Sequence, residues 1–183
     1  YIAIGKVQNA LIVGVDLLSN ISKDLGTKII LADGAGATLL RATDEYKVYH
    51  SYIESEGQKG EILEYQAGSQ IVMQGKEVYR YAVTKTVENV RQLLHKTGFN
   101  IEDIAYYILH QSNQKIMDAI SERLKIPKEK VYTNIARVGN TFCASIPICL
   151  DEMRAQGMLH KKDKVLFLGY GGGLNTGSIL LEI

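Results

Sequence analysis

The sequence predicts a layered α/β fold, because short apolar runs typical of buried strands alternate with longer segments in which apolar residues recur at helical spacing. The clearest helical segment spans 75–97, and its apolar positions are Val78, Ala82, Val83, Val87, Val90, Leu93 and Leu94. The clearest strands are the apolar runs 10–15, 104–109 and 165–168. Alternation of this kind packs helices against the faces of sheets, so we expect buried strands with helical layers on them.

The first seventy residues are expected to contain strands and loops. Residues 10–15 are apolar, 27–31 carry β-branched side chains, and 37–40 have the pattern of a further strand. The segment Asp33–Gly36 lacks the lysine and the glycine spacing of a phosphate-binding loop, so it is interpreted as a close-packed turn. The polar stretch 46–70 is rich in Gly, Ser, Glu and Tyr and predicts short strands and surface loops.

The remaining residues are expected to alternate helix and strand to the end of the chain. Gly98 follows the helix 75–97 and suits the left-handed conformation that ends many helices. Pro127 marks the end of a second helix. The segments expected after Gly98 are a strand at 104–109, a helix at 115–124, a short strand at 131–136, a helix from Asn140 or Thr141 to Gln156, and strands at 165–168 and 178–183.

Composition and charge exclude several classes of protein. Lys and Arg total 21 against 20 Asp and Glu, so net charge gives no reason to expect nucleic acid or a membrane surface as partner. The apolar runs are far shorter than the roughly 20 residues of a membrane-spanning helix, and residues 1–5 lack the features of a signal peptide, so we expect a soluble cytoplasmic protein. Cys143 and Cys149 have a spacing that suits neither a disulfide nor a metal site, and we expect two buried thiols and no metal.

A faint internal repeat suggests a division of the chain. The segment around Gly5 and the strand after it are similar to the segment around Gly157 and the strand after it. We therefore expect one complete unit at 71–183, preceded at 1–70 by the end of a similar unit and a connecting segment. On this interpretation a helix that should precede Gly5 lies upstream of Tyr1.

The predicted positions of two polar side chains make them candidate catalytic residues. His110 comes directly after the strand 104–109, where α/β proteins place ligands, and Asn140 lies between Gly139 and Thr141 ahead of a helix. A neutral imidazole and an amide suit the stabilisation of a developing oxyanion. Asn140 fits an ordinary helix cap equally well, and Gly171–Gly173 fits a tight turn as well as a source of backbone donors. The other histidines, His50, His95 and His160, have no such setting and are expected at the surface.

Five segments taken together resemble β-ketoacyl-acyl-carrier-protein synthase III of the thiolase superfamily. They are Asp33–Ala37, Met73–Val78, His110–Asn113, Gly139–Pro147 and Gly171–Gly173, in that order. The resemblance covers nearly all 183 residues. It implies the duplicated thiolase fold, with layers α-β-α-β-α in the complete enzyme, of which this chain would hold the end of the first half and the whole second half.

The resemblance also implies an activity and a set of site residues. In this family an acyl group passes from a coenzyme A thioester to a cysteine and then condenses with malonyl-acyl carrier protein, with loss of carbon dioxide, to initiate fatty acid synthesis. His110 and Asn140 match the catalytic residues that stabilise the enolate, and Gly172 matches the oxyanion-hole glycine. Asn113 and Gly75 match positions that bind pantetheine. Arg80, Lys115 and Arg123 match positions that dock the carrier protein, although each is equally an ordinary solvated helix charge.

The same resemblance implies a homodimer in the full-length protein and no cofactor, since coenzyme A enters as a thioester substrate. The family's nucleophilic cysteine would lie upstream of Tyr1, and neither Cys143 nor Cys149 matches it, so the chain alone is expected to be inactive. Three departures are present: Ser22–Leu25 lacks the arginine that stacks on the adenine of coenzyme A, Leu174–Gly177 differs near the acyl pocket, and Ser112 replaces the commoner alanine. The altered coenzyme A segment favours one alternative, a synthase-III-like acyltransferase of secondary metabolism. A second alternative is a non-catalytic thiolase-fold partner subunit, which would be favoured if the upstream helix began without a cysteine.

Overall fold

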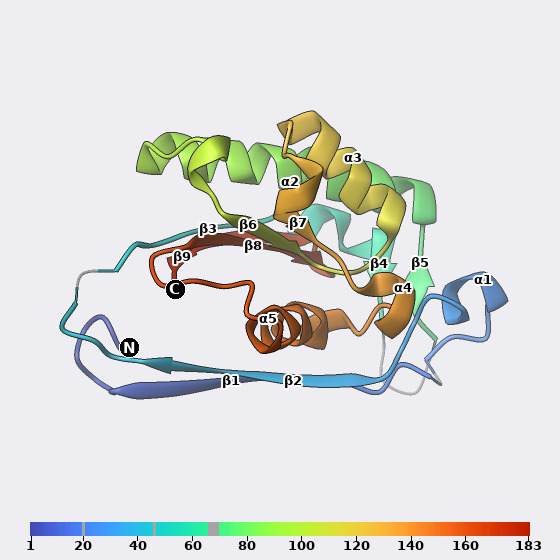
Figure 1. Ribbon diagram of the computed structural model, residues 1–183. Coiled ribbons are helices and arrows are strands. Elements are labelled where there is room, and N and C mark those ends of the chain that lie inside the picture. Colours follow the sequence, from blue (N-terminus) through green and yellow to red (C-terminus); the bar gives the residue numbers. More distant parts are fainter. Residues whose placement is uncertain (20, 46, 66–69) are drawn as a thin grey trace.

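The protein is built of four layers, two of helices and two of sheet (Figure 1). The computed structural model describes residues 1–19, 21–45, 47–65 and 70–183. Helices α2 (Gly75–Thr97) and α3 (Gln114–Leu124) cover one face of a five-stranded sheet, and α5 (Ser145–Ala155) covers the other. Beneath α5 lies a two-stranded sheet, β1 (Asn9–Asp16) and β2 (Gly34–Arg41). The predicted α/β class is confirmed.

The five-stranded sheet brings three strand ends to one edge. Its order is β3-β9-β8-β6-β7, where the strands are β3 (Tyr49–Ser55), β9 (Asn175–Glu182), β8 (Lys164–Gly171), β6 (Tyr106–Leu109) and β7 (Val131–Tyr132). Strand β6 is parallel to both β7 and β8, whereas the other pairs are antiparallel. The carboxyl ends of β6, β7 and β8 therefore meet at the same edge, and His110 follows directly on β6.

Strand β6 is apolar along its whole length because it is buried on both faces. Tyr107 and Leu109 point into the core beneath α2 and α3, while Ile108 points into the core beneath α5, where it packs with Cys149 and Met153. All five of these side chains are at most 1% exposed. Alternate residues of the strand thus anchor both layers, which fixes the position of the residue after it.

The ends of the two covering helices follow from local sequence. Gly98 adopts the left-handed conformation with φ of 75° and donates its N–H to the Leu94 carbonyl, as predicted. Asn113 caps α3, because its side-chain oxygen accepts the N–H of Lys115 at 2.9 Å. Helix α3 therefore starts immediately after the loop that carries His110.

The interpretation of Asp33–Gly36 as a turn is wrong, because Gly34–Gly36 begin strand β2. The small residues serve close packing instead. A Cβ added to Gly36 would lie 2.7 Å from the Cβ of Pro147, and one added to Gly14 would lie 2.7 Å from the Cys143 carbonyl oxygen. The two-stranded sheet therefore reaches the start of α5 closely enough to touch its backbone.

Two further segments differ from the prediction. Residues 27–31 are not a strand: Asp24 accepts the Thr27 N–H at 2.7 Å and starts the helical turn α1 (Leu25–Lys28), so the cap overrides the β-branched side chains. The strand predicted at 131–136 stops at Tyr132, because only Val131 and Tyr132 pair with β6 before the helical turn α4 (Ile135–Val138).

Shorter elements complete the described chain. The polar stretch holds β3, which is an edge strand of the main sheet, and a short strand β4 (Leu63–Glu64) that pairs with β5 (Val72–Met73); Tyr46 and residues 66–69 lie outside the described residues. The outer face of β1 and β2 exposes the apolar side chains of Leu11, Val13, Val15 and Leu39. In the part of the chain that the structure describes, no helix is long and apolar enough to cross a membrane.

Candidate active site

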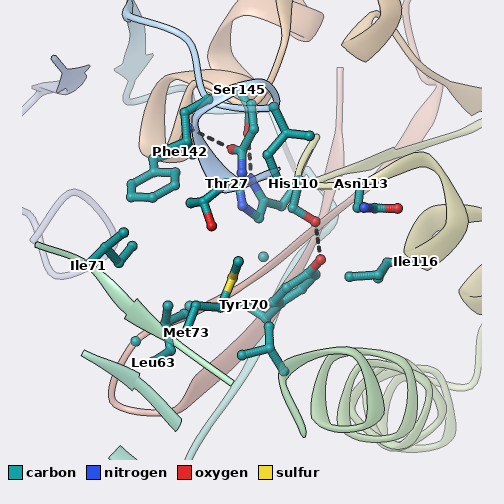
Figure 2. Close-up of a pocket in the computed structure, with 18 of the residues that line it drawn as sticks. Thr27, Leu63, Ile71, Met73, His110, Asn113, Ile116, Phe142, Ser145 and Tyr170 are labelled. Atoms are coloured by element: carbon teal, nitrogen blue, oxygen red, sulfur yellow. Dashed lines mark hydrogen bonds between the residues drawn. The ribbon is translucent and has the colours of Figure 1, made fainter. Parts of the chain in front are cut away.

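His110 projects from the carboxyl end of β6 into a cavity at this edge of the five-stranded sheet, which is also lined by residues of β4, β5 and the first turns of α2. Its backbone N–H binds the Leu168 carbonyl at 2.7 Å, which continues the pairing of β6 with β8 by one residue. Its Nδ1 lies 2.8 Å from the Ser145 hydroxyl oxygen (Figure 2). The loss of water around the imidazole lowers the pKa of His110 to about 4, against a weaker opposing effect of the Asp16 charge. The ring is therefore neutral at neutral pH.

Asn140 is buried and is held through its backbone by the segment before β2. Its N–H donates to the Ile30 carbonyl and its carbonyl accepts the N–H of Ala32, each at 2.9 Å. Its side-chain oxygen accepts the Phe142 N–H at 3.1 Å, which fixes the amide and turns the NH₂ group the other way. Asn140 is not a helix cap: Thr141 precedes the 3-10 turn Phe142–Ala144 as its N-cap, and helix α5 begins only at Ser145.

Gln111 ties the loop of His110 to the loop that leads to Asn140. Its side chain is fully buried, and its oxygen accepts the Asn134 N–H at 3.1 Å while its NH₂ group donates to the Leu109 carbonyl at 2.7 Å. Because these partners lie on β6 and after β7, one side chain holds the two loops at a fixed separation.

His110 and Asn140 both line one cavity of about 560 Å³. Its walls are mostly apolar and include Leu63, Ile71, Met73, Ile116 and Phe142 (Figure 2). The structure brings together five predicted site residues in its lining: His110, Asn140, Gly172, Asn113 and Gly75. Among the described residues, neither Nε2 of His110 nor Nδ2 of Asn140 has a hydrogen-bond partner. The cavity is therefore lined by a neutral imidazole and a neutral amide, both suited to hydrogen bonding.

The three basic residues predicted to dock a carrier protein do not line this cavity. Arg80 is exposed on the first turns of α2 and pairs with Glu77 at 3.0 Å. Lys115 and Arg123 are exposed at the two ends of α3. Their docking role stays a prediction, as does the division of the chain near residue 70.

The prediction of two buried thiols is half wrong. Cys149 is buried, and burial raises its pKa to about 12. Cys143 is exposed, because the 3-10 turn that contains it places it on the cavity wall, where its thiol donates to the Asp16 carboxylate at 2.6 Å. Burial and the Asp16 carboxylate raise the pKa of Cys143, so neither thiol is activated as a nucleophile.

Two residues of the site were not singled out from the sequence. Ser145 contacts His110, and the Tyr170 ring meets the imidazole edge-on at 5.4 Å between centroids. The Tyr170 hydroxyl bonds to that of Ser112, and burial raises the pKa of Tyr170 to about 12. Ser145 is 35 residues from His110 in sequence, and no local pattern marks that contact.

The chain matches two family models, described as 3-oxoacyl-[acyl-carrier-protein] synthase III over residues 1–57 and as the C-terminal part of the same enzyme over residues 94–183. It is 37% identical over 198 residues to a β-ketoacyl-[acyl-carrier-protein] synthase III of Clostridium novyi, and 38% identical over 201 residues to that of Thermosynechococcus vestitus. Both alignments cover 100% of this chain and 61% of the relative.

Solved structures agree with these matches. The crystal structure of 3-oxoacyl-[acyl-carrier-protein] synthase III from Aquifex aeolicus superposes with a TM-score of 0.96 at 36% identity, covering 100% of this chain and 60% of that one. The enzyme from Thermus thermophilus gives a TM-score of 0.94 at 30% identity. The chain thus spans about three fifths of the length of the relatives that it matches.

Proposed function

Since the chain belongs to the 3-oxoacyl-[acyl-carrier-protein] synthase III family, we propose that the protein condenses an acyl group from a coenzyme A thioester with malonyl-acyl carrier protein and so initiates fatty acid synthesis. One observation supports this most strongly. The neutral imidazole of His110 and the amide of Asn140 face one mostly apolar cavity, and Nε2 and Nδ2 have no hydrogen-bond partner among the described residues.

The donors suit the decarboxylation step. When the malonyl carboxylate leaves as carbon dioxide, the electron pair of the broken carbon–carbon bond moves into the thioester, and negative charge develops on its oxygen. A preorganised donor at such an oxygen is worth roughly 2.7–4 kcal/mol of barrier in a dry site. His110 acts as a neutral donor in this step, because its pKa of about 4 leaves it uncharged at neutral pH. The enolate carbon then attacks the acyl thioester and expels the thiolate that carried the acyl group.

In this proposal the other residues of the cavity bind rather than react. The N–H of Gly172 stabilises the oxyanion of the acyl thioester. The Asn175 side chain donates to the Gly172 carbonyl at 2.7 Å and so holds the peptide unit that follows in the same turn. Asn113 and Gly75 contact the pantetheine arm along the cavity wall. We place the acyl-carrying cysteine outside these 183 residues, because both thiols described here have raised pKa values.

Partners and location are part of the same proposal. Acyl-CoA and malonyl-acyl carrier protein are substrates, and Arg80, Lys115 and Arg123 offer positive charge to the acidic carrier protein from exposed helix positions. We further propose a homodimer that acts in the cytoplasm without a resident cofactor, as the family resemblance implies. The near-balanced charge of the chain supports neither nucleic acid nor a membrane surface as partner.

The test separates the two half-reactions in the full-length protein. His110→Ala and Asn140→Ala should each lower malonyl-acyl carrier protein decarboxylation about 10²–10³-fold, because each removes one donor. The rate of cysteine acylation, monitored by mass spectrometry, should change little in either variant. Equal loss of both half-reactions would contradict the roles given to these residues.

One observation favours a second candidate, an acyltransferase of secondary metabolism with the same fold. The segment before α1 has no arginine, and Asp24 there is engaged in capping the helical turn. Comparing acetyl-CoA with the acetylated carrier protein as primer distinguishes the two: preference for the carrier-bound primer supports the second candidate. A protein with neither decarboxylation nor acylation would instead be a non-catalytic partner subunit.

A further inference from the structure

The Ser145 hydroxyl is enclosed between His110 and Gln111. Ser145 is 1% exposed at the start of α5, and its Oγ lies 2.8 Å from Nδ1 of His110. The same oxygen accepts the backbone N–H of Gln111 at 3.4 Å. No other partner of this hydroxyl occurs among the described residues, so its hydrogen-bond geometry is settled by these two neighbours.

Counting donors and acceptors assigns the proton. A serine hydroxyl has one proton to donate, and the Gln111 N–H can only donate to it. If Nδ1 of His110 also carried a proton, the oxygen would face two donors and its own proton would be buried without an acceptor. A buried, unsatisfied donor is unfavourable, whereas an unprotonated Nδ1 accepts the serine proton and satisfies all three groups.

We propose that Ser145 is a positioning residue that holds neutral His110 in the tautomer with its proton on Nε2. Nε2 has no hydrogen-bond partner in the described part of the chain, so this tautomer presents an N–H to the cavity. The opposite tautomer would present a lone pair, which repels an oxyanion. The catalytic meaning of this assignment rests on the proposed function, but the tautomer itself does not.

The segment that holds Ser145 orients the second donor in the same way. Phe142 donates its backbone N–H to the Asn140 side-chain oxygen at 3.1 Å, which leaves the amide NH₂ as the group facing the cavity. Residues 142–145 thus supply one donor to an amide oxygen and one to an imidazole nitrogen. Each contact turns an ambiguous side chain into a donor toward the cavity.

The tautomer is measured by NMR on histidine labelled with ¹⁵N, without any assay of activity. His110→Gln identifies the His110 signals among the four histidines of the chain. At pH 7 the wild type should show a protonated Nε2 and an unprotonated Nδ1, and Ser145→Thr, which keeps a hydroxyl, should preserve that pattern. Ser145→Ala should show a mixture of both tautomers. Ser112→Ala is the matched control, because its hydroxyl bonds Tyr170 rather than His110, and it should keep the wild-type pattern.

A wild type with its proton on Nδ1 would overturn the proposal, whether or not the alanine variant folds. So would a Ser145→Ala variant that keeps the pure Nε2 tautomer. In the full-length protein, Ser145→Ala should lower decarboxylation about tenfold, less than the roughly 10²–10³-fold of losing a donor outright, and threonine should restore it. An unchanged rate with a changed tautomer overturns the positioning role. If the full-length wild type does not decarboxylate malonyl thioesters, the proposed function fails while the tautomer result still supports the assignment to Ser145.

Discussion

Replacing His110 with glutamine is expected to make the stability of the protein less sensitive to mild acid. The folded protein holds the pKa of this histidine at about 4 instead of 6.5, chiefly because the ring has lost its contact with water. Between those two values the unfolded chain binds a proton that the folded protein refuses. The contribution of His110 to the free energy of unfolding is therefore fully present above pH 6.5 and is lost as the pH falls toward 4.

The size of the effect follows from the same two pKa values. A difference of about 2.5 pH units at 1.36 kcal/mol each amounts to about 3 kcal/mol of unfolding free energy. Carboxylates also titrate in this range, but they contribute equally to both proteins and cancel when the variant is compared with the wild type. His95→Gln is the matched control, because His95 is exposed on α2.

Urea denaturation of the three proteins at pH 7 and pH 4 measures these free energies. The wild type and the His95 variant should lose about 3 kcal/mol more than His110→Gln on acidification. Equal losses in all three would show that His110 is not a buried neutral group. The interpretation of its Nε2 as an uncharged donor would then fall as well.

Two further predictions concern stability. Gln111→Leu should cost about 2–3 kcal/mol in urea denaturation, because the buried N–H of Asn134 loses its acceptor; a cost below about 0.5 kcal/mol would show that the two loops do not depend on this side chain. Gly14→Ala should cost about 1–3 kcal/mol, because the new methyl group would lie 2.7 Å from the Cys143 carbonyl oxygen. Gly75→Ala, with no atom within 4 Å of the added carbon, should be neutral or stabilising by up to about 1 kcal/mol, and equal destabilisation of both variants would refute the close approach.

The sequence predicted those parts of the fold whose cause is local or periodic. Helix α2 follows from its repeated apolar positions, and its end follows from Gly98, whose left-handed conformation is observed. The helical turn at Leu25–Lys28 was missed because one hydrogen bond from Asp24 outweighs the strand preference of the residues after it. The strand start at Gly34 was missed because glycine there is explained by a contact distant in sequence: an added Cβ would lie 2.7 Å from the Thr141 side chain.

The candidate site was predictable in its members and not in its connections. His110 and Asn140 are each marked by their place at the end of a strand or ahead of a helix, and the cavity does contain both. The contact of Ser145 with His110 joins residues 35 apart, and no periodicity records it. The exposure of Cys143 depends on how a 3-10 turn is oriented against Asp16, which spacing alone does not determine.

The backbone pairing of Asn140 with Ile30 and Ala32 has a consequence for how the protein folds. These partners are separated by about 110 residues, so their hydrogen bonds require the closure of a very long loop. Proteins fold more slowly when the residues that contact one another lie far apart in sequence. Helices α2, α3 and α5 can form early from local contacts, but Asn140 acquires its final backbone geometry only after the segment of Ile30 and Ala32 has docked. Residues 71–183 alone would therefore contain both donors and still leave one of them unplaced.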